Sequence, residues 1–174
     1  MLSIVIPARN ERKQIGSLLD SIVEQKFSES LEVVVADAAS TDGTQEFVMS
    51  YAGRLDIKIV EGGLPPVARN RGARAARGDT LLFCDADASF PTETFLSENL
   101  AAFKTRDLSI GAAELLPKSS RLIDAFIFGI GNISLRLLAH IRPVGSLCMI
   151  MRRDVFEKAG GYPEELAAGE DNEM

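Results

Sequence analysis

The chain has few of the residues that build zinc sites. Its 174 residues include two cysteines and one histidine. Cys84 and Cys148 lie in apolar runs and form no Cys-x-x-Cys pattern, and His140 stands alone. Zinc centres need several such ligands at short spacings. The sequence therefore gives no zinc signal, and both thiols are expected to be buried core residues in a reducing compartment.

The common phosphate-binding loops are also missing. No Gly-x-x-x-x-Gly-Lys-Ser/Thr loop occurs, and residues 72–78 lack the Gly-x-Gly-x-x-Gly turn of a dinucleotide fold. These loops hold phosphate through backbone N–H groups at a helix start. Their absence argues against P-loop and nicotinamide-dinucleotide chemistry.

The chain lacks a positive charge balance. Its formal charge of −6 argues against a nucleic-acid partner or a general anionic-membrane surface. A phosphate ligand would need a local basic cluster and a cation. Four arginines lie within nine residues and form either that cluster or a solvated helix face: Arg69, Arg71, Arg74 and Arg77.

Neither a leader nor a linker is visible. No charged segment or cleavage site precedes the first apolar run, so we expect a cytoplasmic protein. No repeat or low-complexity stretch divides the chain, and its 46% hydrophobic content suffices for one core. We expect one domain over residues 1–174, with a regularly alternating half to about residue 106 and a less regular half after it.

Strand and helix patterns alternate along the first half. Residues 2–6, 31–36, 57–60 and 80–84 are apolar, strand-like runs, and helical spacing of apolar residues follows the first of them. Further helices are expected from about Thr44, from Pro66 and from Pro91. Strands are expected at residues 108–113 and 147–151, with a short helix at residues 154–158. This alternation is typical of an α/β fold with a mainly parallel sheet.

Carboxylates follow the strand at residues 80–84. Asp85-Ala86-Asp87 places two carboxylates one residue apart, where either a metal site or an acidic turn before a helix would fit. Residues 7–11 and Asp37 follow two other strands. Parallel strands bring these ends to one rim, where ligands bind and where paired hard oxygens suit Mg²⁺ or Mn²⁺ bound to a diphosphate.

Residues 122–141 are apolar and nearly long enough to span a bilayer. Asp124, Asn132, Arg136 and His140 recur at multiples of four, so a helix here would carry a polar stripe. Burying a central Asp or Arg costs about 2.5 to 3.5 kcal/mol on insertion scales, which disfavours a true span. Contact with a membrane surface and packing against the protein or a partner both remain open.

Several motifs, in order, resemble glycosyltransferase family 2 of the GT-A fold, particularly membrane-associated bacterial or archaeal members. They are Pro7-Ala8-Arg9-Asn10-Glu11, Asp37 with Ser40-Thr41-Asp42-Gly43, Ala68-Arg69-Asn70-Arg71-Gly72, Asp85-Ala86-Asp87, Gly160-Gly161-Tyr162-Pro163-Glu164 and Gly169-Glu170-Asp171. The resemblance covers essentially the whole chain. It implies a Rossmann-like, mainly parallel sheet flanked by helices, with a nucleotide-sugar binding half over about residues 1–106 and an acceptor-side extension over about residues 107–174.

The resemblance also implies an inverting, metal-dependent transfer of a sugar from a nucleotide-diphosphate donor to a lipid-linked or glycan acceptor. Pro7, Ala8 and Glu11 would frame the nucleoside, Asp37 would bind the base, and Arg69 would contact the nucleotide or diphosphate. The motif Asp85-Ala86-Asp87 would hold ribose and Mn²⁺ or Mg²⁺, with Asp87 and Asp85 as its metal residues. Asp171 would be the general base, although the neighbouring Glu170 is an alternative. A polyprenyl-linked acceptor at the inner face of the membrane would suit residues 122–141.

The chain departs from the family pattern in two places. Ala38 and Ala39 stand where members often have an acidic residue and a glycine, and we expect this change to be tolerated. The sequence ends three residues after Asp171, so the acceptor half is expected to be incomplete. Two other functions stay open: a nucleotide-sugar binding module without activity, and a nucleotidyltransferase that releases pyrophosphate. The second is disfavoured because no glycine-rich basic loop follows the first strand.

Overall fold

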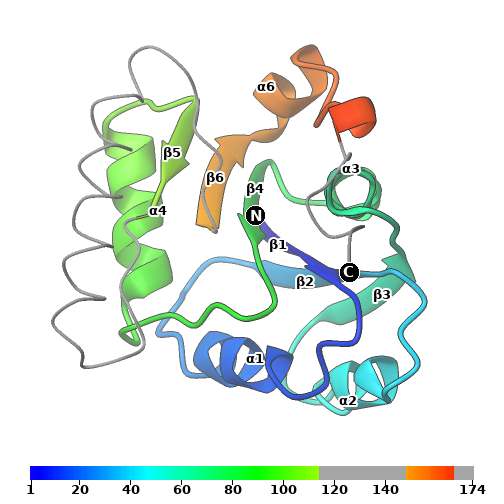
Figure 1. Cartoon of the computed structure of the whole chain (residues 1–174). Coiled ribbons are helices and arrows are strands. Elements are labelled where there is room, and N and C mark those ends of the chain that lie inside the picture. Colours follow the sequence, from blue (N-terminus) through cyan, green and yellow to red (C-terminus); the bar gives the residue numbers. More distant parts are fainter. Residues whose placement is uncertain (114–147, 167–174) are drawn as a thin grey trace, which may run out of the picture.

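A six-stranded mixed sheet forms the centre of the molecule. The computed structural model describes residues 1–113 and 148–166, and its strand order is β3-β2-β1-β4-β6-β5 (Figure 1). The strands are β1 (Leu2–Ala8), β2 (Leu31–Asp37), β3 (Ile57–Glu61), β4 (Thr80–Cys84), β5 (Ile110–Ala112) and β6 (Cys148–Arg152). The first four strands are parallel, whereas β6 runs antiparallel to both β4 and β5. The predicted mainly parallel α/β fold is confirmed.

Helices connect the parallel strands and cover both faces of the sheet (Figure 1). They are α1 (Ile15–Val23), α2 (Thr44–Met49), α3 (Pro65–Ala75), α4 (Phe95–Thr105) and α6 (Arg153–Lys158), followed by the 3-10 turn Glu164–Leu166. Two prolines, Pro65 and Pro66, occupy the first turn of α3, where a missing backbone N–H costs nothing. The helices predicted at Thr44, Pro66 and 154–158 are therefore present.

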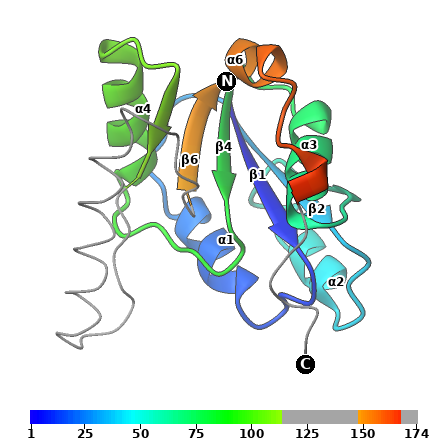
Figure 2. The ribbon, with the colours of Figure 1, turned by 45° about the horizontal axis from the view of Figure 1, so that its top comes forward.

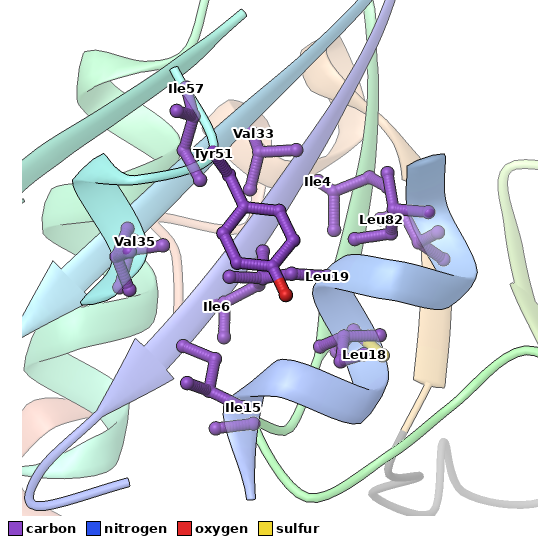
Figure 3. Packing of buried hydrophobic residues seen from close by; sticks show 14 of the residues in the cluster. Ile4, Ile6, Ile15, Leu18, Leu19, Val33, Val35, Tyr51, Ile57 and Leu82 are labelled. Carbon is purple, nitrogen blue, oxygen red and sulfur yellow. The ribbon is translucent and has the colours of Figure 1, made fainter. Parts of the chain in front are cut away.

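The alternation of side chains along the strands divides the core into two layers. Ile4 and Ile6 of β1 pack with Leu18 and Leu19 of α1, while Val5 of the same strand packs on the opposite face with residues of α3. Figure 3 shows the first layer, in which Tyr51 and the β2 residues lie beside these side chains. Successive strand residues point to opposite faces, so a central strand covered on both faces is mainly apolar.

One glycine allows α3 to approach the sheet closely. A Cβ atom at Gly72 would lie 2.4 Å from the Val5 side chain, which is closer than van der Waals contact permits. Glycine in a helix interior costs about 1 kcal/mol relative to alanine. Close packing of α3 on β1 explains why it stands here.

A buried carboxylate links the parallel strands near their amino-terminal ends. Glu32 on β2 is 1% exposed and accepts hydrogen bonds from Ser3 Oγ at 2.7 Å and Arg77 Nε at 2.9 Å. Lys58 Nζ lies 3.3 Å from the second Glu32 oxygen. Burial raises the pKa of Glu32, but the bonds from Ser3, Arg77 and Lys58 outweigh it and lower the pKa to about 2.

The start of α4 differs from the sequence prediction. Pro91 and Thr92 were expected to open this helix, but it begins at Phe95. The preceding turn instead binds the end of α1, because Gln25 Nε2 donates to the Thr92 carbonyl at 2.8 Å and Gln25 Oε1 accepts from Leu96 N at 2.9 Å. If the helix began earlier, the Leu96 N–H would donate to the Thr92 carbonyl. Gln25 binds both of these backbone groups instead.

Part of the chain lies outside the described residues. The prediction for residues 122–141 falls there, as does that for Asp171. Within residues 1–113 and 148–166, no helix combines the length and apolar character needed to cross a membrane. Both predicted core thiols, Cys84 and Cys148, are buried, at neighbouring positions of β4 and β6.

Candidate functional site

A cleft of about 360 Å³ opens where the carboxyl ends of β1 and β4 meet the start of α3. It contains most of the residues predicted to bind the nucleotide and metal. These are Pro7, Ala8, Glu11, Arg69, Asp85, Ala86 and Asp87. Parallel strands bring sequence-distant residues to one rim, which is the usual ligand position in an open α/β sheet. The structure therefore brings these seven positions together in one cleft, and their roles in binding stay predictions.

Glu11 is the least satisfied polar group of the cleft. Its Oε2 atom is buried and has no hydrogen-bond partner. Burial is the largest cause that raises the pKa of this carboxyl, followed by the negative charges of Asp87, Asp42 and Asp85. An unsatisfied buried oxygen among like charges is costly, so the cleft favours a cation or a hydrogen-bond donor at this place.

Asp85 and Arg69 form an ion pair across the cleft. Arg69 Nη2 donates to Asp85 Oδ1 at 2.6 Å, and the two side chains are 21% and 26% exposed. Burial raises the pKa of Asp85, Arg69 acts against this by attraction, and the nearby Asp87 raises it again. The arginine thus holds the first carboxylate of the motif in a fixed orientation.

The donor set of the cleft fits a hard divalent cation. No group of three or more His, Cys, Asp or Glu side chains is arranged for metal binding within residues 1–113 and 148–166. Asp85 and Asp87 nonetheless supply carboxylate oxygens beside the unsatisfied oxygen of Glu11. Mg²⁺ and Mn²⁺ often bind one or two carboxylates and complete their coordination with substrate phosphates and water. These residues therefore fit a cation that arrives with a diphosphate.

A polar clamp fixes the loop that carries Glu11. Asn10 N donates to Ser40 Oγ at 2.8 Å, and Asn10 Oδ1 accepts from Thr41 N at 2.9 Å. Glu11 N donates to Thr44 Oγ1 at 3.0 Å. The turn after β2 thus holds the loop after β1 in place. Sequence proximity could not indicate this clamp, because its partners are about thirty residues apart.

Asp37 lies beside the rim but does not line the cleft. It is buried and accepts hydrogen bonds from Ser40 N at 2.9 Å and from Gln45 Nε2 at 2.6 Å, so it organises the turn after β2. Contact between Asp37 and a base stays a prediction. Within this turn Ala39 has φ +55°, a left-handed conformation that glycine adopts more easily than alanine. Members of the family that the sequence resembles often have glycine at this position.

The four arginines, for which a phosphate cluster and a solvated helix face were both open, separate in space. Only Arg69 lines the cleft. Arg71 pairs with Glu61 at 2.7 Å, Arg74 lies 3.9 Å from Glu164, and Arg77 binds Glu32. The helical period points Arg69, Arg71 and Arg74 in different directions from α3, and Arg77 comes after the end of this helix. The basic cluster is therefore a single cleft arginine with three structural neighbours.

Four cleft residues were not singled out from the sequence. Arg9 follows β1 inside the motif that ends at Glu11, and Gly63, Leu64 and Pro65 precede or begin α3. The signal for Arg9 was its place in that motif, and the signal for the others was the proline-marked helix start. A helix N-terminus at the cleft adds partial positive charge, which favours a bound anion.

A second hollow has different chemistry. It measures about 140 Å³, lies between α4, β5 and β6, and is mainly apolar. Arg106 is the one charged side chain in the lining that the structure describes. Of these two hollows, the cleft at the strand ends is the one with carboxylates in its described lining, namely Glu11, Asp85 and Asp87.

Comparison with known proteins agrees with this geometry. The family model described as glycosyl transferase family 2 matches residues 3–160. The poly(ribitol-phosphate) β-N-acetylglucosaminyltransferase TarS of Staphylococcus aureus is 36% identical over 106 residues, 58% of this chain and 18% of that protein. The dolichol-phosphate mannosyltransferase of Pyrococcus furiosus is 28% identical over 167 residues, 90% of this chain and 47% of that protein.

A solved structure extends the similarity to the fold. The mannosyltransferase PcManGT of Pyrobaculum calidifontis, in complex with GDP-Man and Mn²⁺, superimposes with a TM-score of 0.73 at 27% identity. The match covers 93% of this chain and 47% of that one, so this chain spans about half or less of the length of these relatives. The GT-A fold predicted from the motifs is thereby confirmed, and the chain belongs to glycosyltransferase family 2.

Proposed function

We propose that the cleft binds a nucleoside-diphosphate sugar together with Mn²⁺ or Mg²⁺, and that the full protein transfers the sugar with inversion. The observation that carries this proposal is the unsatisfied Glu11 oxygen beside the Asp85 and Asp87 carboxylates. A cation would offset the negative charges of these carboxylates, and a diphosphate would carry such a cation into the cleft as its counter-ion. The bound mannose nucleotide and Mn²⁺ of the Pyrobaculum calidifontis relative support the same donor class.

The side chains of the cleft have separate roles in this proposal. Asp87 and Asp85 would hold the cation, which when bound would neutralise the negative charge that develops on the leaving diphosphate. Arg69 keeps Asp85 oriented and faces the same charge from α3. Pro7 and Ala8 provide a wall at the end of β1 against which a nucleoside can lie. Preorganised charges of this kind lower the barrier because they need no reorganisation during the reaction.

The acceptor side of the proposal rests on the sequence. Asp171, or the adjacent Glu170, would take the proton of the acceptor hydroxyl as general base. A lipid-linked acceptor at the cytoplasmic face of a membrane would suit the apolar residues 122–141. The dolichol-phosphate mannosyltransferase relative supports an acceptor of this class.

Calorimetric titration tests the donor site directly. UDP, GDP and dTDP are titrated into the chain with Mn²⁺ and with chelator, for the unaltered protein and for Asp87→Asn. One nucleotide should bind in a metal-dependent manner, and Asp87→Asn should weaken it at least about tenfold, or about 1.4 kcal/mol. Asp79→Asn is the matched control, because Asp79 is a 90% exposed carboxylate that pairs with the N-terminus. Equal binding by both variants would contradict the metal role of Asp87.

Turnover separates transfer from binding alone. Release of nucleoside diphosphate from the matching nucleotide sugar, measured with and without a polyprenyl phosphate, should depend on metal and on Asp87. Tight metal-dependent binding without any release would favour the binding-module alternative. Pyrophosphate release from a nucleoside triphosphate would instead identify a nucleotidyltransferase.

A further inference from the structure

A late segment of the chain lies against the helix that supplies the cleft arginine. Residues 160–166, drawn in orange and red, run beside α3 in both views (Figures 1 and 2). The segment begins after α6 with Gly160 and Gly161, whose φ values are +77° and +83°. Two consecutive left-handed residues turn the chain sharply back toward α3, a path that other residues rarely adopt.

Asn70 holds this segment through three hydrogen bonds. It is 1% exposed, its Nδ2 donates to the Tyr162 carbonyl at 2.9 Å and to Glu164 Oε1 at 2.8 Å, and its Oδ1 accepts from Tyr162 N at 2.8 Å. A Cβ atom at Gly161 would lie 2.6 Å from Asn70 Oδ1, so glycine is needed for this approach. Both the N–H and the carbonyl of Tyr162 are thus hydrogen-bonded to α3 through Asn70.

The ring of Tyr162 links the core to the cleft. The ring meets Phe83 of β4 edge-on, with the two ring centroids 5.2 Å apart. The guanidinium carbon of Arg69 lies 5.6 Å from the centroid of the Tyr162 ring. Burial raises the pKa of Tyr162 to about 12, so the phenol is neutral at physiological pH. A cation within about 6 Å of an aromatic face is attracted by the ring quadrupole.

We propose that Tyr162 is a positioning residue for the donor site: its ring holds the Arg69 guanidinium against Asp85, and Asn70 fixes the backbone that carries the ring. The chain of contacts runs from Asn70 to Tyr162, then to Arg69 and to Asp85 in the cleft. Arg69 is adjacent to Asn70 on α3, so the same helix carries both the guanidinium and the clamp for its support. This proposal rests on the proposed donor site and adds to it a residue from the late, acceptor-side part of the chain.

Support from an aromatic ring matters because Arg69 has a long side chain. Fixing such a chain in one arrangement costs rotamer entropy. Contacts that fix it before the donor arrives reduce the cost of binding. An unsupported guanidinium would still reach Asp85, but it would populate that arrangement less often, and the diphosphate would have to restrain it.

The chain offers a matched control for this role. It contains two tyrosines, and both are near an arginine. Arg54 lies 4.3 Å from the centroid of Tyr51, which is buried in the α1–α2 layer and is not part of the cleft lining. Tyr51→Leu and Tyr162→Leu therefore remove the same ring and the same kind of arginine contact from two different places.

Nucleotide affinity in the presence of Mn²⁺ is the first measurement. Tyr162→Leu should weaken binding by about tenfold, the upper range of a partly desolvated cation–π contact, whereas Tyr162→Phe should bind within about twofold of the unaltered protein. Tyr51→Leu should lose stability but keep its affinity. Equal losses of affinity in the two leucine variants would overturn the proposal, because they would reflect general destabilisation.

A double-mutant cycle tests whether the effect passes through Arg69. In an Arg69→Met background, Tyr162→Leu should cause no further loss of affinity, because the supported group is already gone. Additive losses would overturn the proposal. If Tyr162→Leu does not fold, fluorinated phenylalanines placed at position 162 keep the ring shape while weakening its quadrupole, and affinity should fall stepwise with fluorination.

A nucleotide-free measurement distinguishes this proposal from failure of the donor site. The Arg69 guanidinium resonances in ¹⁵N spectra report on its pairing, since rotation of a paired guanidinium is slowed. They should remain resolved in Tyr162→Phe and Tyr51→Leu and merge in Tyr162→Leu. Resolved resonances in Tyr162→Leu would overturn the positioning role. Absence of nucleotide binding by the unaltered protein, with these spectral changes intact, would refute the proposed function alone.

Discussion

Replacing Glu32 by glutamine removes the buried charge that joins β2 to β1 and to Arg77. The pKa of Glu32 falls from 4.5 to about 2 on folding, because the bonds from Ser3, Arg77 and Lys58 outweigh burial. At 1.36 kcal/mol per unit, this difference corresponds to about 3 kcal/mol of stability at pH 7. Glu32→Gln imitates the protonated side chain and should lose about this amount.

The sign of the pH dependence follows from the lowered pKa. The contribution of Glu32 is fully present above its unfolded value of 4.5 and is lost as the pH falls toward about 2. The advantage of the unaltered protein over Glu32→Gln should therefore shrink by about 0.8 kcal/mol at pH 4 and about 2 kcal/mol at pH 3. Urea denaturation of both proteins at pH 7, 4 and 3 measures the difference.

Glu29→Gln is the control for this experiment. Glu29 pairs with Lys104 at 2.6 Å, but the two side chains are 41% and 53% exposed, so the loss should stay below about 1 kcal/mol. A loss for Glu32→Gln no larger than this, or one that does not change with pH, would refute the assignment of a stabilising buried carboxylate.

Two further substitutions follow from the cleft and its neighbouring turn. Ala39→Gly should raise the free energy of unfolding by about 1 kcal/mol, because glycine relieves the φ of +55°, whereas Ala38→Gly should not raise it; urea midpoints compare the two. Glu11→Gln should stabilise the nucleotide-free protein at pH 7, because burial first, and then Asp87, Asp42 and Asp85, raise the pKa of this carboxyl in the folded state. That gain should fade as the pH falls through the raised folded-state pKa and be absent below the unfolded value of 4.5. Mn²⁺-dependent nucleotide affinity should also fall, and a loss of stability at pH 7 would contradict the electrostatic account.

The elements that the sequence predicted well are those whose whole length is buried. β1, β2 and β4 lie in the interior of the sheet and need apolar residues on both faces, so their runs are unmistakable. The start of α4 was misplaced because Pro91 is a local helix signal, while the competing hydrogen bonds of Gln25 come from a distant segment. The position of β6 between β4 and β5 has no local signal at all.

The site was predictable as a rim but not as a set of contacts. Asp37 and Asp85 both come directly after their predicted strands, residues 31–36 and 80–84, yet Asp37 is used in its own turn while Asp85 faces Arg69 in the cleft. Spacing alone could not distinguish them, since both have the same place relative to their strand. The separation of the four arginines depends in the same way on partners elsewhere, such as Glu61 and Glu32.

The place of β6 determines the order in which the sheet can be completed during synthesis. β4 pairs with β1 on one side and with β6 on the other, and β5 contacts the sheet through β6. The parallel unit β3-β2-β1-β4 can therefore assemble once residue 84 has emerged, whereas residues 110–112 must wait for residues 148–152. Until then β4 presents an open edge of unpaired backbone groups, which is the kind of edge that other strands can join. Slow translation between residues 84 and 152 would lengthen the time for which the edge of β4 is exposed, whereas early pairing with β6 would cover that edge.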